Sequence, residues 1–440
     1  MDYQNKKVVI IGLGLTGLSC LDYFMSKGIN PRLIDTRKSP TGLSTIPKEI
    51  EVHTGSIKLD WVLDADLLVV SPGVPLATPE IQEAIKKGIE VVGDIELFCR
   101  EVNNANAQII AITGSNGKST VTSLVGQMAI SNRIKTAVGG NIGLPVLSFL
   151  EDKHDLYVLE LSSFQLETTY SLKAKAATIL NISEDHLDRY ADNIENYITA
   201  KHRIYNKAQT TVYFVNDAHT RPKTNESQSL VDFGGTNSPY RIEKIEGEEW
   251  LIADNKPLMQ CTEVALKGYH NYLNILAALA LAKTVGIDPK SCIETLKHFS
   301  GLAHRFSVVH EANGITWVND SKATNVGSVI AALKDFNREG KIHLLMGGDS
   351  KSANLTPLIP ILKDGKKQIY CFGQDGQKIQ SLSPENSVFV ETLEEAMQLA
   401  RKNAVEGDWI ILSPACASLD QFKNYEHRGQ VFIELANQLS

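Results

Sequence analysis

One short stretch of the chain carries the residue types that hold a polyphosphate. Residues 113–120 run Thr-Gly-Ser-Asn-Gly-Lys-Ser-Thr. Glycines allow several backbone N–H groups to face one anion, Lys118 supplies a cation for the outer phosphates, and Ser119 or Thr120 supplies a hydroxyl for Mg²⁺. The sequence therefore predicts a site for a nucleoside triphosphate and a metal. Its residues are Gly114, Ser115, Asn116, Gly117, Lys118, Ser119 and Thr120.

The segments on either side have the arrangement that such a loop requires. Residues 108–112 form an apolar run typical of a buried parallel strand, and residues 121–130 have helical composition. The match to the general P-loop pattern is incomplete, because Ile112 stands at its first glycine position and Gly114 is an additional glycine. The alternative is a glycine turn followed by an exposed lysine. The strand–loop–helix context favours the phosphate loop.

A second glycine motif lies near the N-terminus. Residues 12–17 are Gly-Leu-Gly-Leu-Thr-Gly, between a strand expected at 7–11 and a helix expected to end near Lys27, and Asp35 closes the next strand. A full G-x-G-x-x-G with an acidic residue about 20 positions later is typical of NAD or FAD binding. The motif places a helix N-terminus beside a diphosphate, however, so any nucleotide diphosphate would satisfy it. Both interpretations stay open at this point.

Charged residues follow two further predicted strands. Glu160 ends the strand expected at 156–159, where a carboxylate one strand from a P-loop can hold Mg²⁺. Residues 183–189, Ser-Glu-Asp-His-Leu-Asp-Arg, follow the strand expected at 176–181. His186 is therefore a candidate metal ligand or phosphate contact. The alternatives are a surface glutamate and a solvated histidine.

Three polar loops follow predicted strands in the last third of the chain. They are residues 319–325, 347–351 and 413–418. Doubly wound domains build their sites at the carboxyl ends of parallel strands, so three such loops on one edge favour a site over a solvated rim. Lys351 is a candidate cation for an acidic substrate, and Asp320 and Lys322 suit a nucleotide.

Composition excludes several classes of protein. The 440 residues are 43% hydrophobic and 22% charged, with a net charge of -7 and a pI near 5.9. No long basic tract is present, so nucleic acid is not an expected partner. The start leads directly into a strand, unlike a signal peptide, and no apolar run approaches the ~20 residues of a membrane helix. The six scattered cysteines are typical of reduced thiols, which indicates a cytoplasmic location.

Length predicts about three domains, all of the α/β class. The expected domains are a Rossmann-like domain at 1–94, a central P-loop ATPase-like domain with a mostly parallel sheet at 95–300, and a Rossmann-like domain at 301–440. Helices are expected at 193–206 and 271–285, and antiparallel strands at the edge of the central sheet over 210–267. Strands of the third domain are expected at 316–318, 342–346, 368–372 and 409–412.

Several long blocks together resemble the Mur ligases of bacterial cell-wall synthesis. These blocks are the loop 114–120, Leu-Glu-Leu-Ser-Ser-Phe-Gln at 159–165, Glu-Asp-His at 184–186 and the loop 319–325. Residues 12–17, 35–37 and 413–424 narrow the resemblance to the activity that adds D-glutamate. The resemblance covers essentially the whole chain. It implies an ATP-dependent ligase that joins D-glutamate to UDP-N-acetylmuramoyl-L-alanine through an acyl phosphate, with ADP and phosphate as products.

The resemblance also implies a role for each candidate residue, and it assigns the N-terminal glycine motif to UDP and not to NAD. The implied UDP-sugar residues are Leu15, Thr16, Asp35, Thr36, Arg37, Gly73, Asn141, Ser162 and Gln165. The implied ATP residues outside the P-loop are Asn274, His304, Arg305, Asp320 and Lys322. The implied D-glutamate residues are Thr324, Lys351, Ser418, Leu419 and Tyr425. The implied metal residues are Ser119, Glu160, His186 and Lys201.

Lys201 would be an ordinary surface lysine on composition alone. It stands in Ala-Lys-His-Arg-Ile-Tyr, where the family carries a lysine whose amine takes up CO2 and becomes a carbamate. The carbamate is an anion that helps to position Mg²⁺, and the amine must be neutral to react. Lys118, Lys201 and His186 are the implied catalytic residues, in a protein that we expect to be a monomer.

Three positions depart from the family pattern: Ala303 replaces a proline, Ser350 a glycine and Tyr425 a phenylalanine. The sequence does not predict how these three residues affect the specificity and affinity for the substrates. Within the class, the alternatives are a sibling ligase for another amino acid and the folate polyglutamate ligase. Outside it, they are an NAD-dependent oxidoreductase, based on residues 12–17, and a nucleotide-binding regulatory module without turnover.

Overall fold

The computed structural model describes residues 3–439 apart from 41, 104–106, 224–228, 334–335, 337–338 and 364. The chain divides into two compact units. The first unit comprises Met1–Ile182, Glu195–Val264 and Tyr272–His298, and the second comprises Ser183–Ile194, Ala265–Asn271 and Phe299–Ser440. The two short segments therefore pack with the second unit, although the chain on both sides of Ser183–Ile194 belongs to the first.

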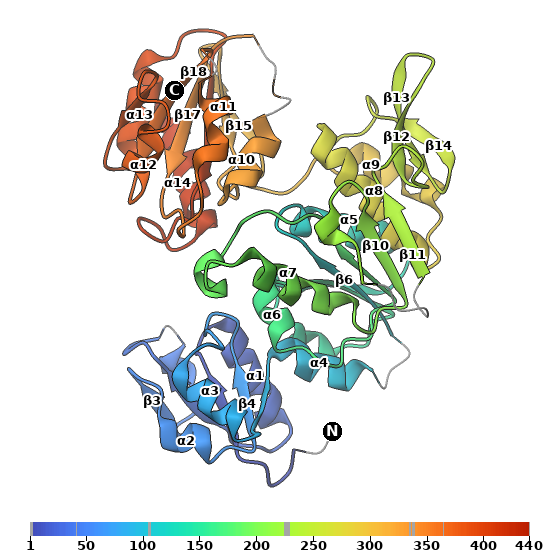
Figure 1. Ribbon diagram of the computed structural model, residues 1–440, viewed down its shortest axis with the longest axis vertical. Helices are drawn as coiled ribbons and strands as arrows, with labels where there is room; N and C mark the ends of the chain where they lie inside the picture. The colour runs from blue at the N-terminus through green and yellow to red at the C-terminus, as the bar shows by residue number, and fades with distance from the viewer. Residues whose placement is uncertain are drawn as a thin grey trace. The chain divides into compact units, whose positions relative to one another are not determined.

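The N-terminal sheet of the first unit has its strands in one direction. Its strands are β1 (Val8–Ile11), β2 (Arg32–Asp35), β3 (Val52–Thr54), β4 (Leu67–Val70) and β5 (Glu90–Val92), and its helices are α1 (Leu15–Ser26), α2 (Leu59–Leu63), α3 (Pro79–Lys86) and α4 (Asp94–Val102). The strand order is β3-β2-β1-β4-β5, all parallel. Helices α1 and α4 cover one face, and α2 and α3 cover the other (Figure 1). Strand β1 is buried along its whole length, which explains its unbroken apolar run.

Helix α4 joins this sheet to the central one. Its side chains Ile95 and Phe98 belong to a single apolar core that also contains Ile109 and Tyr157 of the central sheet. The rings of Phe98 and Tyr157 lie edge to face, with centroids 5.0 Å apart. Because the two sheets share one core, they form one unit.

The central sheet carries the P-loop. Its strands are β6 (Gln108–Thr113), β7 (Thr136–Gly140), β8 (Leu156–Glu160), β9 (Ala176–Ile179), β10 (Thr210–Phe214) and β11 (Ser229–Phe233), and its helices are α5 (Lys118–Ser131), α6 (Ser163–Glu167), α7 (Ile194–His202), α8 (Tyr269–Thr284) and α9 (Ile293–His298). The order is β11-β10-β9-β6-β8-β7, and every pairing is parallel. Strand β6 is central, so its loop lies between the ends of β8 and β9.

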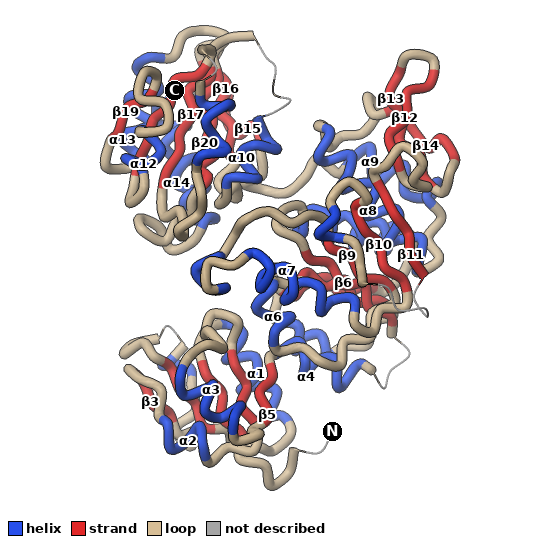
Figure 2. Tube along the Cα trace, viewed as in Figure 1, coloured by secondary structure: helices blue, strands red, loops and turns tan. Residues whose placement is uncertain are grey.

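The prediction of antiparallel edge strands over 210–267 is wrong for the first two strands. Strands β10 and β11 extend the sheet in parallel, because the long connection between them allows a crossover. Among the described residues of this region, the antiparallel strands are β12 (Arg241–Ile245), β13 (Glu248–Ala253) and β14 (Lys256–Gln260), which form a separate sheet (Figure 2).

The second unit contains a third sheet. Its strands are β15 (Ser307–Ala312), β16 (Ile315–Asn319), β17 (Ile342–Gly347), β18 (Lys367–Phe372), β19 (Ser387–Phe389) and β20 (Trp409–Ala415), and its helices are α10 (Val326–Leu333), α11 (Ile359–Leu362), α12 (Gly376–Gln380), α13 (Leu393–Asn403) and α14 (Tyr425–Leu439). The order is β15-β16-β20-β17-β18-β19, with β15 antiparallel and the others parallel. Helices α10 to α12 cover one face, and α13 and α14 cover the other.

Short 3-10 helices complete the described structure. They lie at Leu43–Thr45, Val146–Glu151, Leu187–Tyr190, Arg203–Tyr205, Ala218–Thr220, Pro289–Cys292 and Thr356–Leu358. The α/β class and the three mostly parallel sheets confirm the predicted architecture. The domain boundaries at 94/95 and 300/301 stay predictions.

Candidate functional site

A cavity of about 570 Å³ opens at the carboxyl edge of the N-terminal sheet. Eight of the nine predicted UDP-sugar residues line it, and these are Leu15, Thr16, Asp35, Thr36, Arg37, Gly73, Asn141 and Gln165. Ser162 does not line the cavity. Its side chain caps α6 and contacts Gln165, and through that contact it orients a lining residue. The cavity lies between the ends of β1 and β4, where the strand order of the sheet reverses and ligands bind in this fold.

The glycine motif shapes one wall of this cavity. A Cβ atom on Gly17 would lie 1.8 Å from the carbonyl oxygen of Gly12, so helix α1 can approach the preceding turn only with glycine there. A Cβ on Gly14 would meet no atom within 4 Å. The protein itself therefore does not require glycine at Gly14, which is the position where the motif lets a ligand approach the backbone. Leu15 follows it and is 78% exposed.

Asp35 organises the polar end of the cavity. Its Oδ2 accepts the backbone N–H of Leu13 at 2.7 Å, and both its oxygens accept hydrogen bonds from the Arg37 guanidinium at 2.8 and 2.9 Å. Burial alone would raise the pKa of Asp35, but the hydrogen bonds from Arg37 and Leu13 outweigh it, and the pKa is lowered. The carboxylate therefore remains charged and holds Arg37 at the cavity wall.

The P-loop curls around its own lysine. Lys118 Nζ donates to the carbonyl oxygens of Gly114 and Ser115 at 2.8 and 2.9 Å. Gly117 has a φ of +83°, in the left-handed region, and a Cβ there would lie 2.4 Å from Asn274 Oδ1. The structure thus brings Asn274 of α8, which is a predicted ATP residue, against the loop.

Lys201 is not a surface lysine. It is 1% exposed, and its Nζ donates to Thr113 Oγ1 at 3.2 Å and to the Gly114 carbonyl oxygen at 3.0 Å. The Tyr197 ring lies beneath it, with Nζ 4.7 Å from the centroid. The structure therefore places this lysine behind the P-loop, next to the last residue of β6.

The surroundings of Glu160 fit the role of a metal ligand. It is 1% exposed, and its Oε1 accepts a hydrogen bond from Asn141 Nδ2 at 2.8 Å. Among the described residues, its buried Oε2 has no hydrogen-bond partner. Such an oxygen is costly unless a cation or donor binds it, and a carboxylate oxygen suits Mg²⁺. In the described part of the chain, no group of three or more His, Cys, Asp or Glu side chains could hold a metal.

Three predicted ATP residues lie at the carboxyl edge of the third sheet. Asp320 accepts the Phe306 N–H at 3.1 Å and the Ser413 hydroxyl at 2.8 Å. Burial raises the pKa of Asp320 to about 7, although both hydrogen bonds oppose the shift. Burial also lowers the pKa of His304. Lys322 stacks on the ring of Tyr425, with Nζ 3.7 Å from the centroid.

Arg305, the fourth predicted ATP residue in this unit, lines a second cavity of about 550 Å³. Apolar side chains, among them Phe306 and Val308, line the same cavity, as does Lys267 from the segment Ala265–Asn271. A flat aromatic group with an anionic tail would match this lining.

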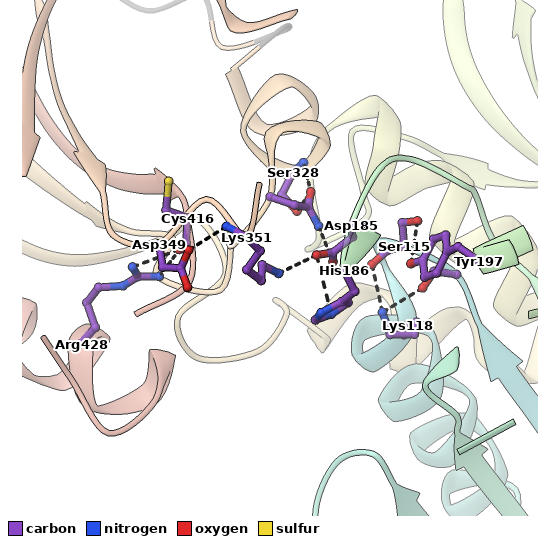
Figure 3. Close-up of polar contacts among 12 residues, drawn as sticks. Ser115, Lys118, Asp185, His186, Tyr197, Ser328, Asp349, Lys351, Cys416 and Arg428 are labelled. Carbon is purple, nitrogen blue, oxygen red and sulfur yellow. Dashed lines mark hydrogen bonds and ion pairs between the residues drawn. The ribbon is translucent and has the colours of Figure 1, made fainter. Parts of the chain in front are cut away.

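The predicted D-glutamate residues also lie in the second unit. Lys351 forms an ion pair with Asp185, and Nζ lies 2.5 Å from Oδ1 (Figure 3). His186 Nε2 lies 3.6 Å from the same oxygen. Ser418 is buried, whereas Leu419 is exposed. The structure assigns His186 to the second unit and Glu160 and Lys201 to the first, so the predicted metal set stays a prediction.

Comparisons with known proteins identify the family. Three family models match consecutive parts of the chain: "Mur ligase MurD-like, N-terminal domain" at residues 6–93, "Mur ligase middle domain" at 112–282 and "Mur ligase, glutamate ligase domain" at 304–416. The chain is a Mur ligase. A UDP-N-acetylmuramoylalanine–D-glutamate ligase of Salmonella typhi is 52% identical over 438 residues, which cover 100% of this chain and 99% of that protein. The protein of the same name from Escherichia coli K12 is 53% identical over the same shares.

Solved structures of Mur ligases and related enzymes share the fold. A UDP-N-acetylmuramate-alanine ligase from Thermotoga maritima matches with a TM-score of 0.62 at 20% identity, over 99% of this chain and 100% of that chain. A pseudomurein peptide ligase type C from Methanothermus fervidus matches with a TM-score of 0.65 at 17% identity, over the same shares. At these identities the likeness supports the architecture alone.

This Mur ligase also contains site-supporting residues that sequence reasoning missed. Arg428 of α14 is 0% exposed and donates to the backbone oxygens of Ser321 and Gly347 at 2.8 and 3.4 Å. It also donates to the backbone oxygen of Cys416 at 3.1 Å (Figure 3). It thereby joins the three polar loops of the third sheet. Nothing local distinguishes it from a surface arginine on an amphipathic helix.

Tyr197 was also missed, and Ser350 was noted only as a departure from the family pattern. Tyr197 precedes Lys201 by four positions on α7, a spacing that places both on one face of the helix. The hydroxyl of Ser350, at a position where the family pattern has glycine, donates to Asp375 Oδ2 at 2.7 Å and anchors the loop that carries Lys351. Within the described residues, no helix has the length and apolar character needed to cross a membrane.

Proposed function

We propose that this Mur ligase adds D-glutamate to UDP-N-acetylmuramoyl-L-alanine and converts ATP to ADP and phosphate, in the synthesis of peptidoglycan precursors. The observation that carries the proposal is the 52–53% identity, over essentially the whole chain, to two proteins named for this activity. The match of the glutamate ligase domain at residues 304–416 supports the same conclusion.

We assign the cavity of the N-terminal sheet to the UDP-sugar. Arg37 supplies a cation for the nucleotide, and the exposed Leu15 supplies an apolar surface for a base. The P-loop, Asn274, His304, Arg305, Asp320 and Lys322 are assigned to ATP. Thr324, Lys351, Ser418, Leu419 and Tyr425 are assigned to D-glutamate.

The reaction needs an activated carboxylate. An oxygen of the L-alanine carboxylate attacks the γ-phosphorus of ATP, the bond to ADP breaks, and an acyl phosphate forms. The amine of D-glutamate then attacks the acyl carbon, and phosphate leaves with the electron pair of the broken C–O bond. The chain contributes positioning and charge: Lys118 and the N–H groups of the loop before α5 would bind the phosphates, which favours in-line transfer.

We also propose that the enzyme uses a metal ion and a chemical modification of a lysine. Mg²⁺ would neutralise charge on the phosphates, and the unpartnered Oε2 of buried Glu160 supports its binding there, with Ser119 as a further ligand. A carbamate on Lys201 is supported by the burial of that side chain beside the P-loop, where the carbamate would supply an anion for Mg²⁺. His186 is proposed as a further metal ligand.

The setting of the reaction is also proposed. We infer a monomer that works in the cytoplasm. All six cysteines lie in the described part of the chain and are buried, and none of them forms a disulfide, which supports a reducing compartment.

Phosphate release from ATP tests the function. The assay contains UDP-N-acetylmuramoyl-L-alanine and one amino acid at a time. Release that requires D-glutamate, and fails with L-glutamate, L-lysine and meso-diaminopimelate, is the expected result. Phosphate release with another amino acid would instead identify the chain as a sibling ligase that adds that amino acid. The absence of release with any of them would reject the ligase activity. The variant Lys118→Met provides a control for contaminating ATPase, because it should release no phosphate.

A further inference from the structure

The imidazole of His304 contacts a buried asparagine in the second unit. Asn319, the last residue of β16, is 0% exposed, and its Nδ2 lies 3.0 Å from His304 Nδ1. Both residues belong to the second unit. His304 is assigned to ATP, whereas no role in the reaction is assigned to Asn319. The contact therefore joins a residue of a proposed binding site to a buried polar side chain.

Two further hydrogen bonds determine which end of the Asn319 amide faces His304. Its Oδ1 accepts the backbone N–H of Ser321 at 3.1 Å, and its Nδ2 donates to the Gly429 carbonyl oxygen of α14 at 2.9 Å. A flipped amide would bring its oxygen against that carbonyl oxygen and its NH2 group against that N–H, so both bonds would be lost. The atom beside His304 is therefore the amide nitrogen, which is a donor.

This orientation determines where the imidazole of His304 carries its proton. The NH2 group of Asn319 needs an acceptor, so Nδ1 is the unprotonated ring nitrogen and Nε2 carries the hydrogen. A doubly protonated ring would direct Nδ1–H at the same NH2 group, and two donors repel one another. Burial of the ring acts in the same direction, because it lowers the pKa of His304, and the negative charge of Glu426 opposes this shift less strongly.

The backbone of His304 and the space for its ring are also fixed. Its φ is +62°, in the left-handed region that residues with a Cβ atom rarely adopt, and its carbonyl oxygen accepts the backbone N–H of Lys322 at 3.0 Å. A Cβ atom on Gly429 would lie 2.3 Å from His304 Nδ1, so the ring fits against α14 because glycine is present there. Such a costly conformation persists where surrounding contacts fix it, and it is typical of functional sites.

We propose that Asn319 is a positioning residue for ATP, which keeps His304 in the tautomer whose Nε2–H is donated to the nucleotide. This inference rests on the proposed function, in which His304 binds ATP. Because Asn319 occupies Nδ1, the nucleotide contacts Nε2. With the proton held on Nε2, the ring recognises an acceptor, such as a phosphate oxygen or a ring nitrogen of the base, and does not recognise a donor.

Asn319→Asp reverses the polarity of this contact. The variant keeps the oxygen that accepts the Ser321 N–H and replaces the NH2 group with an acceptor, so a neutral His304 carries its proton on Nδ1 and presents Nε2 as an acceptor. The KM for ATP should rise about tenfold, because the ring no longer donates to the nucleotide. Asn313→Asp is the matched control, since Asn313 is an exposed asparagine between β15 and β16, and it should leave every KM within about twofold of the wild type.

Two substitutions at His304 test which ring nitrogen contacts ATP. The amide NH2 group of glutamine reaches the position of Nε2, whereas that of asparagine reaches the position of Nδ1. The KM for ATP should therefore be about fivefold lower in His304→Gln than in His304→Asn. Asparagine tolerates the left-handed region better than glutamine, so an effect of backbone strain alone would give the opposite order.

Nitrogen NMR of the full-length enzyme measures the tautomer directly, because protonated and unprotonated imidazole nitrogens have well separated chemical shifts. The protein carries isotope-labelled histidine, and the signals of His304 are identified among the 11 histidines by their absence in His304→Gln. At about pH 9, where histidine is neutral, the wild type should show an unprotonated Nδ1 and a protonated Nε2. Asn319→Asp should show a protonated Nδ1. Phosphate release with ATP varied, at the same pH and at saturating levels of the other substrates, gives the KM values, and melting temperatures verify folding.

The outcomes separate this inference from the function on which it rests. A protonated Nδ1 in the wild type overturns the tautomer. An unchanged KM for ATP in a folded Asn319→Asp overturns the role of Asn319 in binding. If Asn319→Asp does not fold, the two His304 variants decide, and an equal or higher KM in His304→Gln than in His304→Asn overturns the donation from Nε2. In these cases the wild-type enzyme still requires D-glutamate. A wild-type enzyme that releases no phosphate would instead reject the proposed function.

Discussion

Replacement of Glu160 by glutamine should raise the stability of the metal-free protein and weaken the binding of the metal. In the ligand-free chain, Oε1 of Glu160 accepts the Asn141 amide, and Oε2 is buried with no partner among the described residues. Glutamine keeps the first interaction and replaces a buried charged oxygen with a neutral group. We therefore expect Glu160→Gln to fold at least as well as the wild type when no metal is present.

The expected change in the free energy of unfolding follows from the cost of burying the Oε2 atom of Glu160 without a partner. An unsatisfied buried neutral group costs about 1–3 kcal/mol, and a charged one costs more, so the substitution should raise the free energy of unfolding by roughly 1 kcal/mol. That corresponds to a rise of roughly 2–4 °C in the melting temperature. A metal at 100 times its dissociation constant adds about 2.7 kcal/mol to the wild type, and the variant should gain almost none of it. Activity should fall at least about 100-fold.

The assay is thermal denaturation at a series of Mg²⁺ concentrations, with ADP present, beside the phosphate-release assay. The exposed Glu151 provides the control, because Glu151→Gln changes the same charge away from the site and should follow the wild-type curve. Two results would refute the reasoning. One is a variant that is less stable than the wild type without metal. The other is a variant that Mg²⁺ stabilises as much as it stabilises the wild type.

Four further predictions concern the fold and the UDP-sugar cavity. Gly17→Ala should lower the free energy of unfolding by more than about 2 kcal/mol in urea titrations, because its Cβ would lie 1.8 Å from a carbonyl oxygen. Gly14→Ala, whose Cβ meets no protein atom within 4 Å, should keep full stability and raise only the KM for the UDP-sugar. Arg37→Ala should raise that KM about tenfold with little change in kcat, which steady-state kinetics would detect. Burial lowers the pKa of His343, which outweighs the opposite effect of its Asp408 partner. The unfolded chain therefore binds the extra proton, and stability falls as the pH drops below the ordinary histidine pKa, by up to about 1.4 kcal/mol per pH unit. His343→Gln should flatten the dependence of the urea midpoint between pH 7.5 and 5.5, and an equal slope in both proteins would contradict this.

Local patterns were sufficient to predict most of the three parallel sheets. Strands such as Val8–Ile11 and Leu156–Glu160 are buried on both faces, so their apolar runs are unbroken and visible in the sequence. The pairing partner is not a local property. Strands β10 and β11 have the same turn-rich surroundings as the hairpin strands that follow, and only the long connection between them allows parallel pairing. The prediction for 210–267 failed for that reason.

The candidate site likewise contains residues that local sequence patterns predict and residues whose positions depend on distant parts of the chain. The P-loop and the glycine motif consist of adjacent residues, and the structure shows the curled backbone that their glycines predict. The burial of Lys201 depends on Thr113 and Gly114, which are 88 and 87 positions away in the chain. The contact between Asp185 and Lys351 spans 166 positions. No pattern within a single segment contains that information, and only the resemblance to the family pointed to Lys201.

The buried Arg428 explains how the three polar loops of the third sheet keep their shape. Burial lowers the pKa of Arg428 to about 10, and yet its guanidinium donates to backbone oxygens of three loops. Those oxygens end strands or follow them, so Arg428 supplies a donor to buried acceptors at the strand ends. The guanidinium of Arg428 thus donates its hydrogen bonds to backbone oxygens of the loops. Lys351 and Asn325, on loops that follow β17 and β16, are thereby held where they donate to the carboxylate of Asp185.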